Sequence, residues 1–427
     1  MAAHSAFKHI LLLLGVALMS LVAVDATRIM HRPPPEIYHS RPRLGNPHPH
    51  PAPPPKILGG GFLDKEYVSF AYFTNWGIYG ADYLVTNITD SYLTHILYAF
   101  ADTDPINGTV FLTDSYSDEQ ILYPGDSGDD PEHNLYGNLK QLYLLKLQRR
   151  NLKRSFSPGD FNFVTNSTSR AIFVQSAVEI VENYGFDGVD IDFEYPANTD
   201  QQSGLAALVT ELRFAFDVLA ARKGDSVPYQ ITFAAPAGAQ DSQFLDIPKM
   251  NAALSYWSLM GYDYAGPWLN FTDNQANVFG GARTGVSSDM ALNRYISQGA
   301  TACKMNLGMP LYGRAFEDTD GLGDSYNGVG PGTLEAGVYS YNVLPFAGAT
   351  VYENATDITS YSYDPVAREF VTYDTPDIVN LKVQYLKNKG LAGSMFWELS
   401  TDKVGPLSLV GTASQALGQL DRTPNHI

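Results

Sequence analysis

Residues Asp187–Glu194 read Asp-Gly-Val-Asp-Ile-Asp-Phe-Glu (DGVDIDFE), and this stretch decides both the fold and the candidate chemistry. Because successive side chains of a β-strand point to opposite faces, Asp190, Asp192 and Glu194 share one face, roughly 6.6 Å apart per step. The opposite face is apolar, which favours a buried strand over a solvated edge strand. Three buried carboxyls are badly destabilising in a purely structural role, so the stretch predicts a catalytic site. A site for a hard cation is the competing interpretation, but the ligands of such sites usually come from flexible loops.

The crowding of these carboxyls indicates how they work. Like charges close together raise the pKa of one carboxyl, so that it holds a proton at neutral pH. Glu194 stands at the C-terminal end of the expected strand, which is where the active sites of α/β barrels lie. We therefore expect Glu194 to be the proton donor and Asp192 to take or share its proton.

Apolar strand patterns alternate with helical patterns on both sides of this stretch. The expected strands are 69–74, 96–100, 188–193, 230–234, 256–260, 305–309 and 393–397. The expected helices are 135–147, 167–184, 202–222, 289–298 and 378–389. Such alternation predicts parallel βαβ units of the α/β class. Seven strands favour a (β/α)8 TIM barrel with one strand unaccounted for. A doubly wound open sheet is the alternative, but it typically has a Gly-rich phosphate loop after its first strand, which this chain lacks.

The missing third strand has a defined place. The expected helices 135–147 and 167–184 follow one another, and two consecutive helices of a barrel need a strand between them. The segment that joins them is polar and basic, with Lys153 and Arg154 in its middle. We therefore expect the third strand to be missing or distorted. The structure should show either a seven-stranded barrel or a substitute strand recruited from Leu152–Phe161.

The stretch 315–374 differs from the rest of the expected barrel domain, 62–425. It is rich in Gly, Tyr and Asp and contains short β-like pieces. It falls between the last two barrel strands, so it predicts a small inserted α+β module. A long decorated loop is the alternative.

The N-terminal residues predict a secreted, extracellular protein. Lys8 precedes an apolar run, Ile10–Val24, that is shorter than the roughly 20 residues needed to span a bilayer. We expect a signal peptide, 1–26, that is cleaved after Ala26 and leaves no membrane association. A Pro- and His-rich linker or disordered arm, 27–61, follows.

Further features agree with secretion and limit the partners. Five sequons predict N-glycosylation at Asn87, Asn107, Asn166, Asn270 and Asn354. The chain has one cysteine, so no internal disulfide forms, and stability must come from the size of the core. The formal net charge of −17 excludes nucleic acid as an expected partner, since such a surface repels phosphate backbones.

Four motifs in order resemble the family 18 glycoside hydrolases, the chitinase family, over residues 62–417. They are DGVDIDFE (187–194), MGYDYAG (260–266), LYGRAF (311–316) and GSMFWE (393–398). The module at 315–374 resembles the insertion domain of the subgroup with deep clefts. The resemblance implies a secreted chitinase that hydrolyses β-1,4-linked N-acetylglucosamine polymers. Its partner is then chitin or chitooligosaccharides, and it acts as a monomer without a cofactor or a metal.

The resemblance also implies a retaining, substrate-assisted mechanism, in which the acetamido oxygen of the sugar attacks its own anomeric carbon. Glu194 then protonates the leaving oxygen and afterwards activates water. Asp192 binds the acetamido N–H, and Asp190 holds a proton and tunes Asp192. Tyr262 donates its hydroxyl to the acetamido group, and Asp263 hydrogen-bonds the distorted sugar.

Aromatic and long side chains near the strand ends are expected to bind the substrate. The resemblance places Trp397 under the catalytic sugar. We expect four further residues to line the cleft and two tryptophans to stack on neighbouring sugars. They are Tyr72, Phe100, Met260 and Arg314 in the lining, and Trp76 and Trp268 as stacking residues. Each of the six has the plain alternative of a core or surface position.

The chain departs from the family at the third strand. The family carries an S-x-G-G motif there after an apolar run, and this chain has no such motif. The departure implies the loss of a hydroxyl near Asp190 and leaves two alternatives open: a chitin-binding lectin, or a catalytically impaired member. A third alternative is an endo-β-N-acetylglucosaminidase. The presence of Glu194 favours an enzyme, and the expected insertion favours a chitinase.

Overall fold

The computed structural model describes residues 65–128, 134–159 and 161–427. The predicted signal peptide and the Pro/His-rich arm lie outside these residues, so both stay predictions. None of the helices in the described ranges is long and apolar enough to cross a membrane.

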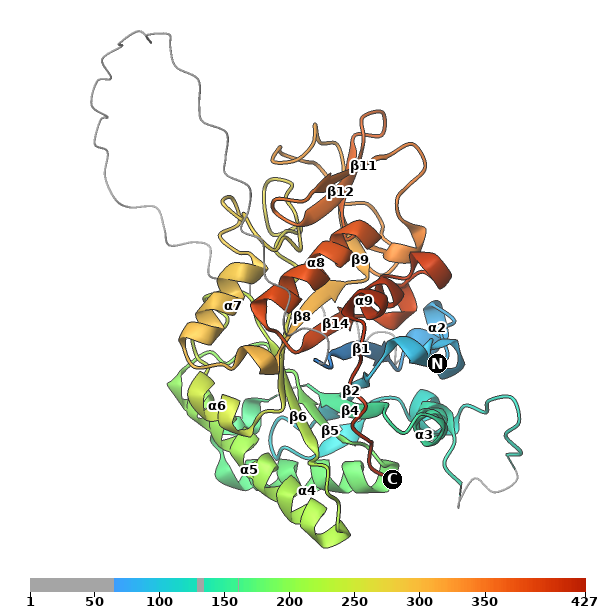
Figure 1. The fold of residues 1–427 in the computed structure, drawn as a ribbon, viewed down its shortest axis with the longest axis vertical. Helices are drawn as coiled ribbons and strands as arrows, with labels where there is room; N and C mark the ends of the chain where they lie inside the picture. The colour runs from blue at the N-terminus through green and yellow to red at the C-terminus, as the bar shows by residue number, and fades with distance from the viewer. Residues whose placement is uncertain (1–64, 129–133, 160) are drawn as a thin grey trace, which may run out of the picture. The chain divides into compact units, whose positions relative to one another are not determined.

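Eight parallel strands close into a barrel (Figure 1). Around the barrel they are β1 (Val68–Thr74), β2 (His95–Thr103), β4 (Lys153–Pro158), β5 (Gly188–Ile191), β6 (Gln230–Ala235), β7 (Tyr256–Leu259), β8 (Met305–Pro310) and β14 (Gly393–Trp397). The barrel closes because β1 pairs with both β14 and β2, and a short strand, β3 (Val110–Leu112), adds antiparallel to β2. The predicted (β/α)8 barrel is confirmed, and the open-sheet alternative is wrong.

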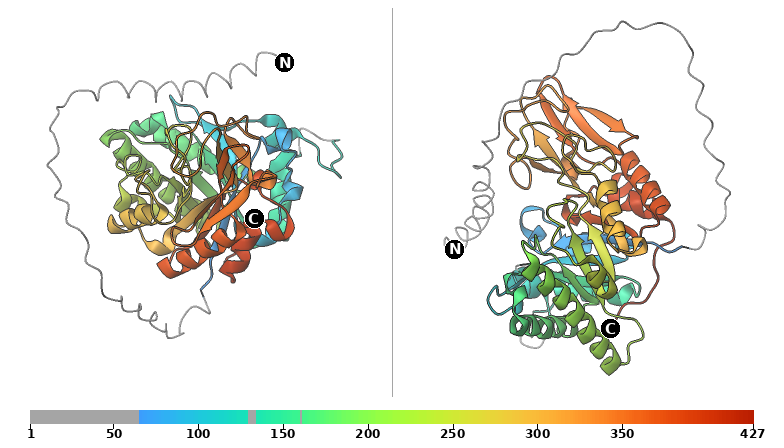
Figure 2. Two further views of the ribbon diagram at one scale, coloured as in Figure 1. Left: turned by 90° about the horizontal axis from the view of Figure 1, so that it is seen from above. Right: turned by 90° about the vertical axis from the view of Figure 1, so that its left-hand side faces the viewer.

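Helices surround the barrel strands, as the two views of Figure 2 show. They are α2 (Gly77–Gly80), α3 (Gly137–Gln148), α4 (Ser167–Tyr184), α5 (Thr199–Lys223), α6 (Ile247–Ala253), α7 (Ser288–Ser297), α8 (Pro376–Lys389) and α9 (Leu409–Leu417). All five helices expected from sequence are present. Asn166 shows why α4 begins where it does, since its side chain accepts hydrogen bonds from the backbone N–H of Thr168 and Ser169.

The alternation on β5 sorts its side chains as expected. Val189 and Ile191 are buried in the main apolar core with residues of the surrounding helices, such as Phe173 of α4. Asp190 points the other way, into the barrel, where it is completely buried. The strand therefore places Asp190 in the interior of the barrel, and the carboxyls that follow it lie at the C-terminal end of the barrel.

The third barrel strand is the substitute strand β4, recruited from the polar segment. It pairs in parallel with β2, where Lys153 is opposite His95, and with β5, where Ser155 is opposite Gly188. The seven-stranded alternative is therefore wrong, and the substitute strand from Leu152–Phe161 is confirmed. Lys153 and Arg154 are each only 2% exposed. They are tolerated because each has polar partners: the Arg154 guanidinium donates to the carbonyl oxygens of Leu139, Tyr184 and Gly185, and the partners of Lys153 are described below.

A five-stranded antiparallel sheet is inserted between β8 and β14. Its order is β10 (Val338–Ser340), β9 (Tyr312–Phe316), β13 (Glu369–Thr372), β12 (Thr359–Asp364) and β11 (Thr350–Asn354). The sheet begins at Tyr312, three residues before the predicted boundary. Residues 312–372 are all described, and apart from these strands they contain loops and one 3-10 turn, Tyr341–Val343. Helix α8 follows the sheet and leads to β14.

Candidate active site

A cleft of about 860 Å³ opens at the C-terminal ends of the barrel strands. Four predicted catalytic residues line it, namely Asp192, Glu194, Tyr262 and Asp263. Five predicted substrate-binding residues line it as well, namely Tyr72, Phe100, Met260, Trp268 and Trp397. The fold thus gathers residues that are more than 300 positions apart in the sequence.

Asp190 lies beneath the cleft as the hub of a buried hydroxyl cluster. Its Oδ2 accepts hydrogen bonds from the Tyr72 hydroxyl at 2.8 Å and from Ser157 Oγ at 3.0 Å. The hydroxyl of Thr232 donates to Oδ1. Burial raises the pKa of Asp190, and these three hydrogen bonds oppose the rise. Ser157 of β4 therefore supplies the hydroxyl that the departure from the family pattern was expected to remove.

Asp192 lies between Asp190 and the cleft. Desolvation raises its pKa well above the usual carboxyl range, and the charges of Glu194 and Asp190 raise it further. Its Oδ1 is enclosed and has no hydrogen-bond partner within the described part of the chain. Asp192 is thus a carboxyl with a raised pKa and with one oxygen that has no partner among the described residues.

Glu194 is accessible from the cleft. Desolvation raises its pKa, and hydrogen bonds with Tyr195 and Asp192 oppose this rise. The charges of Asp263 and Asp241 add to the rise. Because both carboxyls are desolvated and hydrogen-bonded to each other, ionising both of them at once is unfavourable. A carboxyl whose pKa is raised in this way retains its proton more readily than a free glutamate, as a general acid requires.

Tyr262 and Asp263 follow β7 at the cleft wall. Desolvation raises the pKa of Tyr262, which keeps its hydroxyl protonated and able to donate. Asp263 accepts hydrogen bonds from the Tyr312 hydroxyl and from Arg314 Nε, both at 2.6 Å. Its φ of 61° lies in the left-handed region, which is uncommon for residues other than glycine. The inserted sheet, which carries Tyr312 and Arg314 on β9, therefore holds Asp263 in position.

Aromatic rings form the floor of the cleft and extend beyond it. Trp397 stacks on Phe100 at 5.7 Å between ring centroids and meets Tyr72 edge to face at 5.0 Å. Trp76 lies outside the cleft lining, 5.8 Å from Phe100, and is 43% exposed. Trp268 is 53% exposed at the rim.

Arg314 also lies outside the cleft lining, contrary to its predicted place there. Its guanidinium lies 4.8 Å from the centre of the Trp268 ring, while its Nε holds Asp263. It supports two residues of the cleft wall instead of lining the wall itself.

Sequence reasoning missed several residues of the site. Tyr195 and Asp241 line the cleft, and Tyr312 both lines it and binds Asp263. Ser157 and Thr232 bind Asp190. A signal existed only for Tyr312, which stands two residues before Arg314 on one strand, so that both side chains share a face.

All five sequon asparagines are exposed to solvent. They lie at Asn87, Asn107, Asn166, Asn270 and Asn354. Exposure is necessary for N-glycosylation, so the structure is compatible with the modification, which stays a prediction.

Comparisons with known proteins agree with this geometry. The sequence profile of "Glycosyl hydrolases family 18" matches residues 68–402. Endochitinase 1 of Metarhizium robertsii is 43% identical over 84% of this chain and 87% of its own length. Chitinase 1 of Aphanocladium album is 42% identical over 86% of this chain and 88% of its own length. The solved catalytic domain of the psychrophilic chitinase B from Arthrobacter superposes with a TM-score of 0.76 at 26% identity, covering 84% of this chain and 98% of that one. The chain is a member of glycosyl hydrolase family 18.

Proposed function

We propose that this protein is a secreted chitinase that hydrolyses β-1,4-linked N-acetylglucosamine polymers by a retaining, substrate-assisted mechanism. The observation that carries the proposal is the row of carboxyls that begins with Asp190 on β5 and continues just beyond the strand with Asp192 and Glu194, both of which line the cleft. The names of the similar proteins, an endochitinase and chitinases, support the same substrate class.

Glu194 gives its proton to the glycosidic oxygen as the bond to the anomeric carbon breaks. The acetamido oxygen of the same sugar forms a bond to that carbon and closes an oxazolinium ring. Asp192, whose Oδ1 has no hydrogen-bond partner in the described chain, accepts the acetamido N–H and stabilises the positive charge. Water then attacks the anomeric carbon and gives a proton to Glu194, while the bond from the acetamido oxygen to that carbon breaks, so the product keeps the original configuration.

Three side chains orient the acetamido group and the sugar. The Tyr262 hydroxyl donates to the acetamido oxygen, which aims this nucleophile at the anomeric carbon. Asp263, fixed by Arg314, hydrogen-bonds the distorted sugar. Trp397 forms the floor beneath it, since an aromatic face packs well against the apolar face of a sugar ring.

The structure removes the reason to expect an impaired enzyme. The departure at the third strand was expected to cost Asp190 a hydroxyl, yet Ser157 Oγ donates to it at 3.0 Å. Asp190 therefore keeps a set of partners with which it can tune Asp192.

Secretion, N-glycosylation and a monomeric state belong to the same proposal. The expected signal peptide, cleaved after Ala26, releases the chain from the membrane. The five exposed sequons support a glycosylated extracellular protein, and because the chain has a single cysteine, its stability comes from the core and not from internal disulfides.

Incubation of the purified protein with two substrates tests the function. We expect release of short oligosaccharides from a chitin hexasaccharide and no release of glycan from a high-mannose glycoprotein, measured by chromatography. Cleavage of the glycoprotein would instead identify an endo-β-N-acetylglucosaminidase. Tight binding of the hexasaccharide without hydrolysis would identify a lectin.

The charge of Asp241 sets part of the pH dependence. Because its negative charge raises the pKa of Glu194, the Asp241→Asn variant lowers that pKa. The acid must be protonated to work, so the alkaline limb of the kcat/KM profile is expected to move to lower pH. The matched control is Asp217→Asn, an exposed carboxyl on α5 that pairs with Arg213. A limb that stays in place in Asp241→Asn, or moves to higher pH, would contradict the assignment of Glu194 as the acid.

A further inference from the structure

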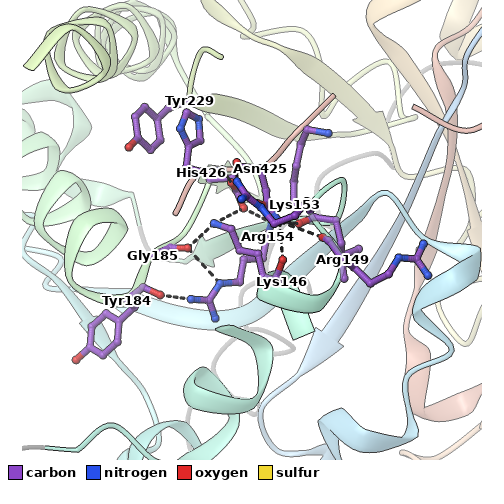
Figure 3. A network of polar contacts seen from close by, with 12 residues as sticks. Lys146, Arg149, Lys153, Arg154, Tyr184, Gly185, Tyr229, Asn425 and His426 are labelled. Atoms are coloured by element: carbon purple, nitrogen blue, oxygen red, sulfur yellow. Dashed lines mark hydrogen bonds and ion pairs between the residues drawn. The ribbon is translucent and has the colours of Figure 1, made fainter. Parts of the chain in front are cut away.

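The last residues of the chain, Asp421–Ile427, cross the N-terminal ends of several barrel strands, and we call them the C-terminal strap. Asp421 N donates to the carbonyl of Tyr67, just before β1, at 2.8 Å. Asn425 and His426 are only 5% and 6% exposed. Figure 3 shows both side chains among the buried cations that surround the start of β4. The strap is thus packed against the N-terminal end of the barrel, which we call the barrel base.

Asn425 binds the turn that leads into β4. Its Nδ2 lies 3.0, 3.1 and 2.8 Å from the carbonyl oxygens of Lys146, Arg149 and Leu152. Its Oδ1 accepts a hydrogen bond from Arg150 Nε at 2.9 Å. One amide side chain, which both donates and accepts, therefore ties together the end of α3 and the start of β4.

The strap also neutralises the first residue of β4. Lys153 is buried inside the barrel, and its Nζ donates to Asp421 Oδ2 and to the carbonyl of Thr423, both at 2.7 Å. A buried ammonium without such partners is strongly unfavourable. The register of β4, which places Lys153 inside the barrel, therefore depends on the strap.

Asp187 connects the strap to β5. Its Oδ1 accepts the backbone N–H of His426 at 2.7 Å, while its Oδ2 accepts the N–H of Arg154 and faces Lys146 Nζ, both at 2.8 Å. The His426 ring stacks on Tyr229, just before β6, at 3.8 Å between centroids. The strap thus spans the bases of β4, β5 and β6.

The other end of β4 reaches the catalytic carboxyls. Ser157 stands four residues after Lys153 on the same face and donates to Asp190. The sheet holds β4 unevenly: it pairs with β2 along its whole length, with a register shift near Ala99, but its ladder with β5 comprises only Ser155 and Phe156, next to the backbone hydrogen bond from Asp187 N to the Arg154 carbonyl.

We propose that the C-terminal strap is a positioning element for catalysis, which holds β4 in the register that brings the Ser157 hydroxyl to Asp190. Asn425 is its principal positioning residue, acting through β4 and not on the substrate. The kinetic tests of this inference rest on the proposed chitin hydrolysis. Hydrogen exchange tests the same inference without measuring activity.

The kinetic test is a double-variant cycle with Asn425→Ala and Ser157→Ala. Asn425→Ala should lower kcat/KM on chitin hexasaccharide on the order of tenfold. It should also shift the pH profile in the same direction as Ser157→Ala. Both effects should be absent when Asn425→Ala is added to Ser157→Ala, since the strap acts through that hydroxyl. Losses that multiply, or an unchanged pH profile in Asn425→Ala, would overturn the proposal.

A matched control separates positioning from general stability. Asn251→Ala also removes a well-bonded side-chain amide. Asn251 lies on α6 and hydrogen-bonds with Trp257 and Thr301. This control should lower the melting temperature and leave the pH profile unchanged. If Asn425→Ala does not fold, the milder His426→Ala replaces it in the same cycle, with the same expected direction.

Hydrogen exchange gives the readout that is independent of activity. Amide exchange in 153–157 and 188–191 should rise in Asn425→Ala and stay unchanged in Asn251→Ala. Unchanged exchange in both variants would overturn the positioning role. An absence of hydrolysis by the unmodified protein would sink the proposed function alone, since the exchange result still decides the role of the strap.

Discussion

Replacing Glu194 with glutamine is expected to lower kcat on chitin oligosaccharides by roughly 10²–10⁴-fold, the usual contribution of a general acid. The amide keeps the size of the side chain but has no acidic proton to give. Substrate binding should survive, because Trp397 and the other lining residues are untouched. Steady-state kinetics and calorimetric titration with a chitin oligosaccharide measure the two effects separately.

The matched control for this variant is Glu211→Gln, a carboxyl on α5 that pairs with Arg170 away from the cleft. It should leave kcat unchanged. If Glu194→Gln turns over substrate as fast as the unmodified protein, Glu194 is not the acid. If it loses binding together with activity, the side chain has a role in holding the substrate that the proposal does not include.

Replacing Asp187 with alanine is expected to lower the free energy of unfolding by about 3–5 kcal/mol, as for other broken buried ion pairs. Lys146, 1% exposed like Asp187, would keep a buried charge without its carboxylate. The backbone N–H groups of Arg154 and His426 would also lose their acceptor. The loss is large because the three contacts of Asp187 join the residue before β5 to three other segments. These are Lys146 of α3, Arg154 of β4 and His426 of the C-terminal strap.

Denaturant unfolding followed by fluorescence measures this change. The exposed Asp217→Asn variant serves as the reference and should stay within about 0.5 kcal/mol of the unmodified protein. Asp187→Asn should fall between the two, since the amide oxygen still accepts one N–H bond. An Asp187→Ala protein as stable as the reference would contradict the view that buried polar contacts hold the third strand.

The barrel strands were predictable wherever the residues of a single strand show an apolar or alternating pattern. On β5, acidic and apolar residues alternate, and this alternation alone gives the strand, its two faces and its catalytic interpretation. β4 was not predictable in this way, because its buried cations are stabilised from elsewhere. The partner of Lys153 is Asp421, 268 positions away, and no local pattern connects the two. Tertiary contacts here outweigh the local polarity of the segment.

The same reasoning explains the candidate site. The residues on β5 and at the ends of β7 and β14 follow from motifs within single segments, and the structure brings them into one cleft. Ser157 and Thr232 could not be found, since they matter only through their contacts with Asp190 from neighbouring strands. Arg314 was placed in the lining because strand patterns do not show which partner a long side chain reaches; it binds Asp263 instead.

The measurement that tests the central claim most directly is proton NMR of the first product released from a chitin hexasaccharide, with a glucose hexasaccharide of the same linkage as the control. Assistance by the acetamido group predicts that the β-anomer appears first and later equilibrates, and that the glucose hexasaccharide, which lacks the acetamido group, is not cut. An initial α-anomer, or cleavage of the glucose hexasaccharide, would contradict substrate-assisted hydrolysis by Glu194.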